Sequence, residues 1–177
     1  MDLSKRKIIL IDGPTGAGKT TTSDLLYKKL PKTAFLGRDR IKWFASDFSR
    51  LRKRDIMIAD RVVEAMCKQY LDFGLSILIE QCFRRKNVVN PYLVLSRKRK
   101  IPLLAYELIA PKKILLHRIK HRPYMCAGKN NLPLWRIHKQ IAAYPHKHFT
   151  ASRLKLDSSQ LSAVQIANRI FKDIKEA

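Results

Sequence analysis

The chain of 177 residues has few cysteines, and their spacing excludes two classes of small protein. The three cysteines, Cys67, Cys82 and Cys126, lie far apart and form no C-x-x-C pair. This pattern argues against a disulfide framework and against a thiolate zinc site. We therefore expect reduced, partly buried thiols.

The sequence also lacks a long hydrophobic run. No uncharged apolar segment approaches the length that crosses a bilayer, and residues 1–7 carry basic side chains but no separate apolar segment or cleavage site of a secretory signal. We therefore expect a soluble, cytoplasmic protein with no membrane partner. Internal repeats and low-complexity tracts are absent too, and the length suits one α/β domain, so we expect a single domain over residues 1–177.

Acidic residues are scarce. The chain has 14 aspartates and glutamates against 37 lysines and arginines, which gives a formal net charge of +23 and a pI near 10.4. The basic residues gather in clusters, at 38–42, 50–54, 84–86, 97–100 and 112–122. Basic stripes are typical of nucleic-acid binding, because lysine and arginine contact phosphates. A solvated basic surface explains the same composition, and both interpretations stay open.

One motif near the N-terminus has a specific meaning. Residues 13–20 match every fixed position of the phosphate-binding loop pattern G-x-x-x-x-G-K-[ST]. The flanking residues predict a buried strand at 7–12 and a helix at 21–30, which is the context the motif requires. Such a loop turns backbone N–H groups toward an anion at the N-terminus of a helix. We therefore expect a nucleoside triphosphate site formed by Gly13, Pro14, Thr15, Gly16, Ala17, Gly18, Lys19, Thr20 and Thr21.

Four residues of this loop have individual predicted roles. Lys19 is expected to reach the β and γ phosphates of ATP, and the Thr20 hydroxyl to bind Mg²⁺. The loop needs glycine at Gly13 and Gly18, because larger side chains there would obstruct the approach of the backbone to the anion.

The rest of the sequence predicts alternating strands and helices. Further strands are expected at 33–37, 75–79, 101–109 and 153–157, and further helices at 39–48, 55–73, 114–121 and 161–175. Gly74 is placed to end the long helix, and Ser158 or Ser159 to cap the last one or to start the turn before it. This alternation implies an α/β fold in which a five-stranded parallel sheet has helices on both faces and ligands gather beyond the carboxyl ends of the strands.

Three further segments resemble motifs of one kinase family. Asp39 follows the second strand and precedes a basic residue by three positions, residues 110–122 contain two arginines four apart, and residues 156–159 end the last strand. Over nearly its whole length the chain resembles the small P-loop kinases, an AAA-domain group that includes polynucleotide kinase, chloramphenicol phosphotransferase and the zeta-toxin kinases. The resemblance implies a three-layer P-loop NTPase fold, a short lid at about 118–132, and ATP and Mg²⁺ as cofactors.

The resemblance also implies roles for residues near the sheet edge. In relatives the aspartate matching Asp39 receives the proton of the attacking hydroxyl, and arginines matching Arg118 and Arg122 contact the phosphates. Considered alone, Asp39 can equally cap the following helix, and the two arginines can form a solvated helix face. Glu80, where many relatives have an aspartate, can hold a magnesium-bound water, act as an alternative base, or be a buried carboxylate engaged in hydrogen bonds.

The same residues narrow the reaction class. The chain has no N-K-x-D segment for reading guanine, and its central strand ends in Glu80-Gln81 instead of an Asp-Glu pair, which disfavours GTPase switches and mechanical ATPases. We expect an ATP-dependent phosphotransferase acting on a hydroxyl of a phosphate-bearing acceptor, such as a nucleic acid end, a nucleotide or a nucleoside. The alternatives are a kinase for an antibiotic or sugar, and a nucleotide-regulated nucleic-acid-binding protein without kinase activity. The sequence leaves the oligomeric state open.

Overall fold

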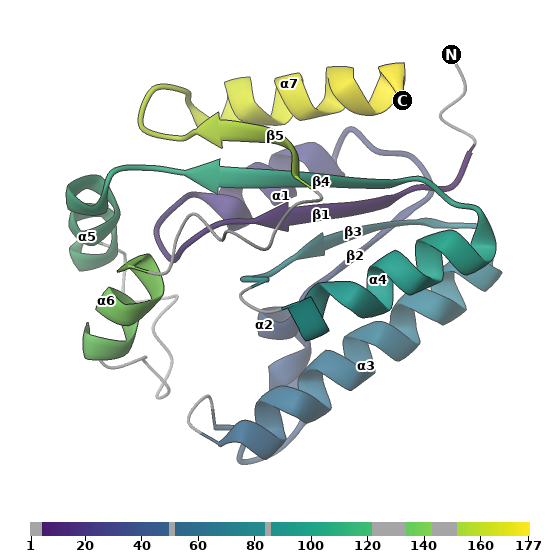
Figure 1. Cartoon of the computed structure of the whole chain (residues 1–177), viewed down its shortest axis with the longest axis horizontal. Coiled ribbons are helices and arrows are strands. Elements are labelled where there is room, and N and C mark those ends of the chain that lie inside the picture. The colour runs from purple at the N-terminus through teal and green to yellow at the C-terminus, as the bar shows by residue number, and fades with distance from the viewer. Residues whose placement is uncertain (1–4, 50–51, 84–85, 122–133, 143–151) are drawn as a thin grey trace.

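A five-stranded, all-parallel sheet forms the centre of the molecule (Figure 1). The structure is a computed structural model that describes residues 5–49, 52–83, 86–121, 134–142 and 152–177. The strand order is β2-β3-β1-β4-β5. The strands are β1 (Ile8–Asp12), β2 (Thr33–Leu36), β3 (Ser76–Glu80), β4 (Leu103–Ile109) and β5 (Ser152–Asp157). The predicted parallel sheet is therefore confirmed, with each strand within two residues of its predicted bounds.

Helices cover both faces of this sheet and make three layers (Figure 1). One face carries α1 (Lys19–Tyr27) and α7 (Ala163–Glu176), and the other carries α3 (Lys53–Asp72) and α4 (Lys86–Arg99). The short α2 (Arg38–Ile41) and the 3-10 helix η1 (Lys42–Phe44) join β2 to α3. At the end of the sheet to which the strands point lie α5 (Lys112–Lys120) and α6 (Leu134–Ala142).

Strand β1 shows why the sheet has two hydrophobic cores. Its side chains alternate between the faces, so Ile8 and Leu10 pack in the core under α3 and α4, while Ile9 and Ile11 pack in the core under α1 and α7. A strand buried on both faces needs a continuous apolar run, which residues 8–11 supply.

Two helices differ from their predictions. The helix predicted at 39–48 is shorter in the structure, because α2 ends at Ile41 and the 3-10 helix after it ends at Phe44, which is 78% exposed. The sequence analysis assigned no helix to residues 86–99, where the structure has α4. Pro91 weakens the helical signal there, because proline lacks a backbone N–H. Burial of Val89, Tyr92 and Leu95 stabilises the helix despite the proline.

The helix ends give one confirmation and one correction. Gly74 follows the C-cap of α3 with a φ of 84°, as expected for a glycine that ends a helix. Ser158 and Ser159 lie in the turn before α7, as one alternative predicted, but they do not cap the helix, because Ser162 accepts a hydrogen bond from the Gln165 N–H in a capping box. The helix therefore begins later than the sequence suggested.

Two of the three cysteines fall within the described residues. Cys67 is buried, Cys82 is half-buried, and both are free thiols, as predicted. Cys126 lies outside these residues. Within the described ranges, no helix combines the length and hydrophobicity that a membrane-spanning segment needs.

Replacement of the α7 cap tests this account of the fold. Ser162→Ala removes the side-chain oxygen that accepts the Gln165 N–H, so the free energy of unfolding should fall by about 1 kcal/mol in urea denaturation. Ser162→Asp supplies another capping oxygen and should keep nearly all of the stability. Equal losses in both variants would contradict the capping role.

Candidate active site

The loop between β1 and α1 is shaped by close backbone contacts. Gly13 packs against β4 so tightly that a Cβ there would lie 2.5 Å from the Leu108 carbonyl oxygen. At Gly18, which precedes α1, a Cβ would meet no atom within 4 Å, and the φ of 85° is what favours glycine. Packing therefore requires glycine at Gly13, and backbone conformation favours it at Gly18. Both causes act whether or not an anion is bound.

A buried carboxylate that the sequence analysis did not single out holds this loop in place. Asp12, the last residue of β1, accepts hydrogen bonds through Oδ1 from Gly13 N at 2.7 Å and from Phe83 N at 2.9 Å. Phe83 lies in the segment after β3, so Asp12 joins the phosphate-binding loop to the end of the neighbouring strand. An acidic residue directly before the loop pattern was the one available signal.

Lys19 lies against the inner side of the loop. Its side chain is 9% exposed, and its Nζ donates a hydrogen bond to the Pro14 carbonyl oxygen at 3.0 Å. Burial lowers the pKa of Lys19, but the negative groups of Cys82, Glu80 and Asp12 raise it more, and the net pKa lies above its usual value. The ammonium group is therefore charged at neutral pH and offers a fixed cation to a phosphate in the loop.

Thr20 and Glu80 lie together beside Lys19. The Thr20 hydroxyl donates a hydrogen bond to Glu80 Oε1 at 3.2 Å. Burial raises the pKa of Glu80 above its usual value, and the Asp39 charge acts in the same direction, whereas Lys19 and Thr20 oppose the shift. The structure thus brings together the two residues that the sequence analysis assigned to Mg²⁺.

These two oxygens fit a magnesium ion. Mg²⁺ prefers hard oxygen ligands and is commonly held by one or two protein groups together with phosphates and water. The residues that the structure describes include no group of three or more histidines, cysteines, aspartates and glutamates that could hold a metal without a substrate. Thr20 and Glu80 would therefore hold Mg²⁺ jointly with a bound nucleotide.

Asp39 lies in the first turn of α2 and does not cap that helix. The N-cap is Gly37, and no side chain caps the helix. The Asp39 carboxylate is 66% exposed and accepts a hydrogen bond from Lys42 Nζ at 3.3 Å. Its negative charge raises the pKa of both Lys19 and Glu80, which places it within electrostatic reach of the phosphate-binding loop.

Gly37 explains how Asp39 comes near the loop. A Cβ at Gly37 would lie 2.4 Å from the Glu80 carbonyl oxygen, so only glycine allows β2 and β3 to end this close together. The chain turns into α2 directly after this contact. The ends of the two neighbouring strands therefore bring Asp39 and Glu80 near each other at the sheet edge.

Arg118 links α5 to two loops. Its guanidinium donates hydrogen bonds to Ser158 Oγ at 3.0 Å and to the Ser158 carbonyl oxygen at 2.6 Å, and it lies 3.4 Å from the Gly16 carbonyl oxygen. Ser158 is itself held on the Ile109 carbonyl oxygen. Arg122 and most of the predicted lid at 118–132 lie outside the described residues, so the pairing of the two arginines stays a prediction.

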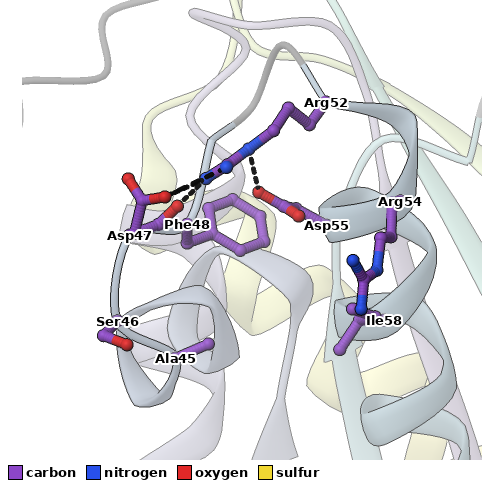
Figure 2. A pocket seen from close by; sticks show the side chains of 8 residues that line it. All are labelled: Ala45, Ser46, Asp47, Phe48, Arg52, Arg54, Asp55 and Ile58. Atoms are coloured by element: carbon purple, nitrogen blue, oxygen red, sulfur yellow. Dashed lines mark hydrogen bonds and ion pairs between the residues drawn. The ribbon is translucent and has the colours of Figure 1, made fainter.

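A pocket of about 190 Å³ lies where the chain enters α3 (Figure 2). Its lining residues are Ala45, Ser46, Asp47, Phe48, Arg52, Arg54, Asp55 and Ile58. Arg52 forms ion pairs with Asp47 at 3.0 Å and with Asp55 at 2.7 Å, as the dashed lines in Figure 2 show. Its charge is therefore offset within the pocket, and this part of the basic cluster at 50–54 is not an open phosphate site.

The basic cluster at 38–42 is paired in the same way. All three of its basic side chains contact carboxylates, in the pairs Arg38–Asp60, Arg40–Asp24 and Lys42–Asp39. A cluster of positive charge in the sequence thus becomes a set of ion pairs in the fold.

Comparison with known proteins places the chain in a family. A family model described as an AAA domain matches residues 8–146, and the chain therefore belongs to this family. No curated protein matches the sequence. The family match agrees with the resemblance to P-loop kinases that the sequence motifs indicate.

Solved structures share the fold over its whole length. A putative kinase from Chloroflexus aurantiacus has a TM-score of 0.77 at 19% identity, with 97% of this chain and 98% of that chain covered. The APS kinase of Mycobacterium tuberculosis, in a complex with AMPPNP and APS, has a TM-score of 0.70 at 16% identity, with 98% of this chain and 99% of that chain covered.

A third similar structure comes from RNA repair. A chain of the Pnkp1/Rnl/Hen1 RNA repair complex has a TM-score of 0.63 at 16% identity, with 78% of this chain and 43% of that chain covered. These likenesses establish the three-layer α/β fold of P-loop kinases for this chain. One of these proteins was solved with APS and another belongs to an RNA repair complex, so the fold does not determine the acceptor.

Substitution of Asp12 tests its role as the anchor of the loop. Asp12→Ala leaves two buried backbone N–H groups without their acceptor, and each such loss costs about 1–3 kcal/mol. We expect a lower midpoint in denaturant unfolding and weaker nucleotide binding in calorimetry. Asp12→Asn keeps one acceptor oxygen, so its denaturation midpoint and its nucleotide affinity should fall less than those of Asp12→Ala. A larger fall in Asp12→Asn than in Asp12→Ala would contradict the role of the oxygen as hydrogen-bond acceptor.

The raised pKa of Glu80 predicts a pH dependence of stability. The folded state holds this proton more tightly than the unfolded state, so the contribution of Glu80 to stability is greatest below its ordinary pKa of 4.5 and falls as the pH rises through the higher folded pKa. Glu80→Gln removes this titration. The melting temperature of the parent relative to Glu80→Gln should therefore fall between pH 4.5 and pH 7, and a constant difference would contradict the shift.

Proposed function

We propose that this chain is an ATP-dependent kinase that transfers the γ-phosphate to a hydroxyl group of an acceptor. The observation that supports it most is the Thr20–Glu80 hydrogen bond beside the buried, charged Lys19, with the Asp39 carboxylate nearby. A loop that binds phosphates, two oxygens suited to Mg²⁺ and a carboxylate suited to a hydroxyl are the parts that phosphoryl transfer needs. A family match and a P-loop kinase fold are in keeping with this function.

The nucleotide side of the reaction rests on the loop. The backbone of Gly13, Pro14, Thr15, Gly16, Ala17, Gly18, Lys19, Thr20 and Thr21 would surround the phosphates of ATP, with the N-terminus of α1 adding positive partial charge. The Lys19 ammonium, now bound to the Pro14 carbonyl oxygen, would turn to the β and γ phosphates. Mg²⁺ on Thr20 and Glu80 would supply neutralisation of charge on the phosphate oxygens.

Asp39 is the proposed general base. The acceptor oxygen forms a bond to the γ-phosphorus while the bond to the ADP oxygen breaks, and the hydroxyl proton passes to the Asp39 carboxylate. The carboxylate is 66% exposed, which leaves it accessible to an acceptor. Glu80 is the weaker candidate for base, because it is buried and bound to Thr20.

Arg118, at the start of the predicted lid, is proposed to contribute positive charge to the bound phosphates. Its guanidinium lies 3.4 Å from the Gly16 carbonyl oxygen, so phosphates bound in the loop would lie close to it. A planar guanidinium suits two phosphate oxygens and would stabilise the charge that spreads over them in the transition state. Arg122, one helical turn further on in the predicted lid, is proposed to act in the same way.

The acceptor that the charge favours is a nucleic acid end, a nucleotide or a nucleoside. The net charge of +23 supports a phosphate-bearing acceptor, because such a surface attracts polyanions. The ion pairs within the cluster at 38–42 favour a second candidate, a kinase for a neutral antibiotic or sugar, because the charges nearest Asp39 are offset.

A panel of acceptors tests the kinase function. Product mass is measured with ATP and Mg²⁺ over 5′-hydroxyl oligonucleotides, nucleosides, nucleotides, sugars and antibiotics. Lys19→Ala should abolish turnover of every acceptor. Asp39→Asn should lower kcat by about 10²–10⁴-fold while ATP binding in calorimetry stays intact. Asp72→Asn makes the same chemical change at an exposed ion pair with Arg99 and should leave kcat unchanged.

One result would remove the kinase function, and a second would remove only the proposed base. Tight binding of ATP and RNA without product from any acceptor would identify a nucleotide-regulated nucleic-acid-binding protein. Full turnover by Asp39→Asn would remove Asp39 as the base while leaving the kinase function in place.

The salt dependence of the acceptor KM distinguishes the two candidate acceptor classes. If the protein binds phosphates of the acceptor, the KM should rise steeply between 50 and 200 mM salt, because counterions compete for the same lysines and arginines (about 10³-fold for six phosphate contacts). A KM that stays constant over this range would favour the neutral acceptor. The KM for ATP serves as the internal reference.

A further inference from the structure

Gln81 has a buried side-chain amide with no hydrogen-bond partner. The residue follows β3 directly and is 5% exposed, and within the described part of the chain neither Nε2 nor Oε1 has a partner. Its backbone N–H is satisfied by the Ile11 carbonyl oxygen at 3.3 Å. Folded proteins pair nearly all buried amides, since an unpaired one destabilises the native state. The Gln81 side chain therefore needs an explanation.

The alternation of β3 gives the direction of this side chain. Ile77 and Ile79 pack in the core under α3 and α4, whereas Leu78 packs in the core under α1 and α7. Glu80 continues the side of Leu78 and reaches Thr20 at the start of α1. Gln81 therefore continues the side of Ile77 and Ile79, at the edge where the strands end. Glu80 serves the nucleotide side, and Gln81 lies on the opposite side.

The neighbours of Gln81 on this side are acidic. Ile11 pairs with Glu80 across β1 and β3, so Asp12 lies next to Gln81, and Asp12 in turn pairs with Glu107 of β4. Both carboxylates are fully buried. Glu107 forms an ion pair with Lys155 at 3.7 Å, and Asp12 accepts the two backbone N–H bonds described above. A phosphate placed beside Gln81 would face these like charges.

We propose that Gln81 binds an uncharged hydrogen-bonding group of the acceptor, next to the hydroxyl that Asp39 deprotonates. This inference rests on the proposed kinase function. β2 and β3 end side by side, so Asp39 and Gln81 follow neighbouring strands. A carboxamide donates and accepts hydrogen bonds, which matches a second hydroxyl or the polar edge of a heteroaromatic ring, whereas an ionised phosphate only accepts. Any phosphate of the acceptor lies elsewhere.

Binding requires a rotation of the Gln81 side chain. Its amide atoms have no contact with solvent in the ligand-free structure, so the acceptor reaches them once the flexible side chain turns toward the end of β3. The unpaired amide makes the ligand-free position unfavourable, which lowers the energy needed for this turn. Stability is thus reduced at a position that substrate binding uses.

The test replaces the amide with an apolar group of similar size. Gln81→Met should raise the KM of the acceptor about tenfold, because a hydrogen bond to the acceptor is lost, and should leave the KM of ATP unchanged. Removal of the unpaired amide should also raise the melting temperature by about 2–4 °C. Gln69→Met makes the same change at an exposed position of α3 and should alter neither quantity.

Acceptor analogues identify the group that Gln81 binds. Each hydroxyl near the phosphorylated one is replaced by hydrogen, each polar ring atom is replaced by carbon, and the KM of every analogue is measured with the parent and with Gln81→Met. One analogue should raise the KM of the parent about tenfold and leave that of Gln81→Met unchanged. If the variant does not fold, the parent decides alone: equal KM values for all analogues overturn the inference.

Three other results would also overturn it. An unchanged acceptor KM in Gln81→Met means that Gln81 does not bind the acceptor, and a lower melting temperature in that case identifies an internal water as the partner of the amide. Absence of product from any acceptor with the parent defeats the proposed function and this inference with it. Product formed equally well by parent and Gln81→Met defeats the inference alone.

Discussion

The hydrogen bonds of the Asp12 carboxylate fix the relation between the two halves of the site. A single oxygen accepts hydrogen bonds from the backbone N–H of Gly13, which begins the phosphate-binding loop, and from that of Phe83, which lies in the segment after β3. Because this carboxylate is fully buried, its bonds are shielded from competition with water. The loop that would bind the nucleotide and the strand end that carries Glu80 and Gln81 are therefore held as one unit.

The two-residue period of β3 separates the tasks of that strand end. Glu80 turns toward α1, where it accepts a hydrogen bond from the Thr20 hydroxyl, and the same alternation assigns Gln81 to the side of Ile77 and Ile79. In the proposed function, the nucleotide would approach Glu80 and the acceptor would approach Gln81, which are adjacent in the chain. Gly37 allows the end of β2 to lie against the end of β3, which brings Asp39 near Glu80. The proposed reaction depends on the meeting of these strand ends, because it brings the proposed residues together.

Ion pairs offset much of the clustered positive charge that the sequence shows near α2 and α3. In the sequence the lysines and arginines near α2 and α3 form strong clusters, but the fold sets scarce carboxylates against them, in the pairs Arg38–Asp60, Arg40–Asp24, Lys42–Asp39, Arg52–Asp55 and Arg99–Asp72. Exposed pairs of this kind add little stability, yet they offset charge locally. The excess charge must therefore act from other surfaces or at long range.

The sequence alone determined the parallel sheet, the phosphate-binding loop and the family, because each depends on residues that are neighbours in the chain: apolar runs, a loop pattern of eight residues and short motifs after strands. It missed α4, where burial outweighs a proline, and the Ser162 cap. Only the tertiary structure decided the contacts of Asp12, the burial of the unpaired Gln81 amide and the attachment of Arg118 to Ser158. These depend on which atoms meet across strands far apart in the sequence, and on which buried atoms are left without a partner, neither of which a linear pattern records.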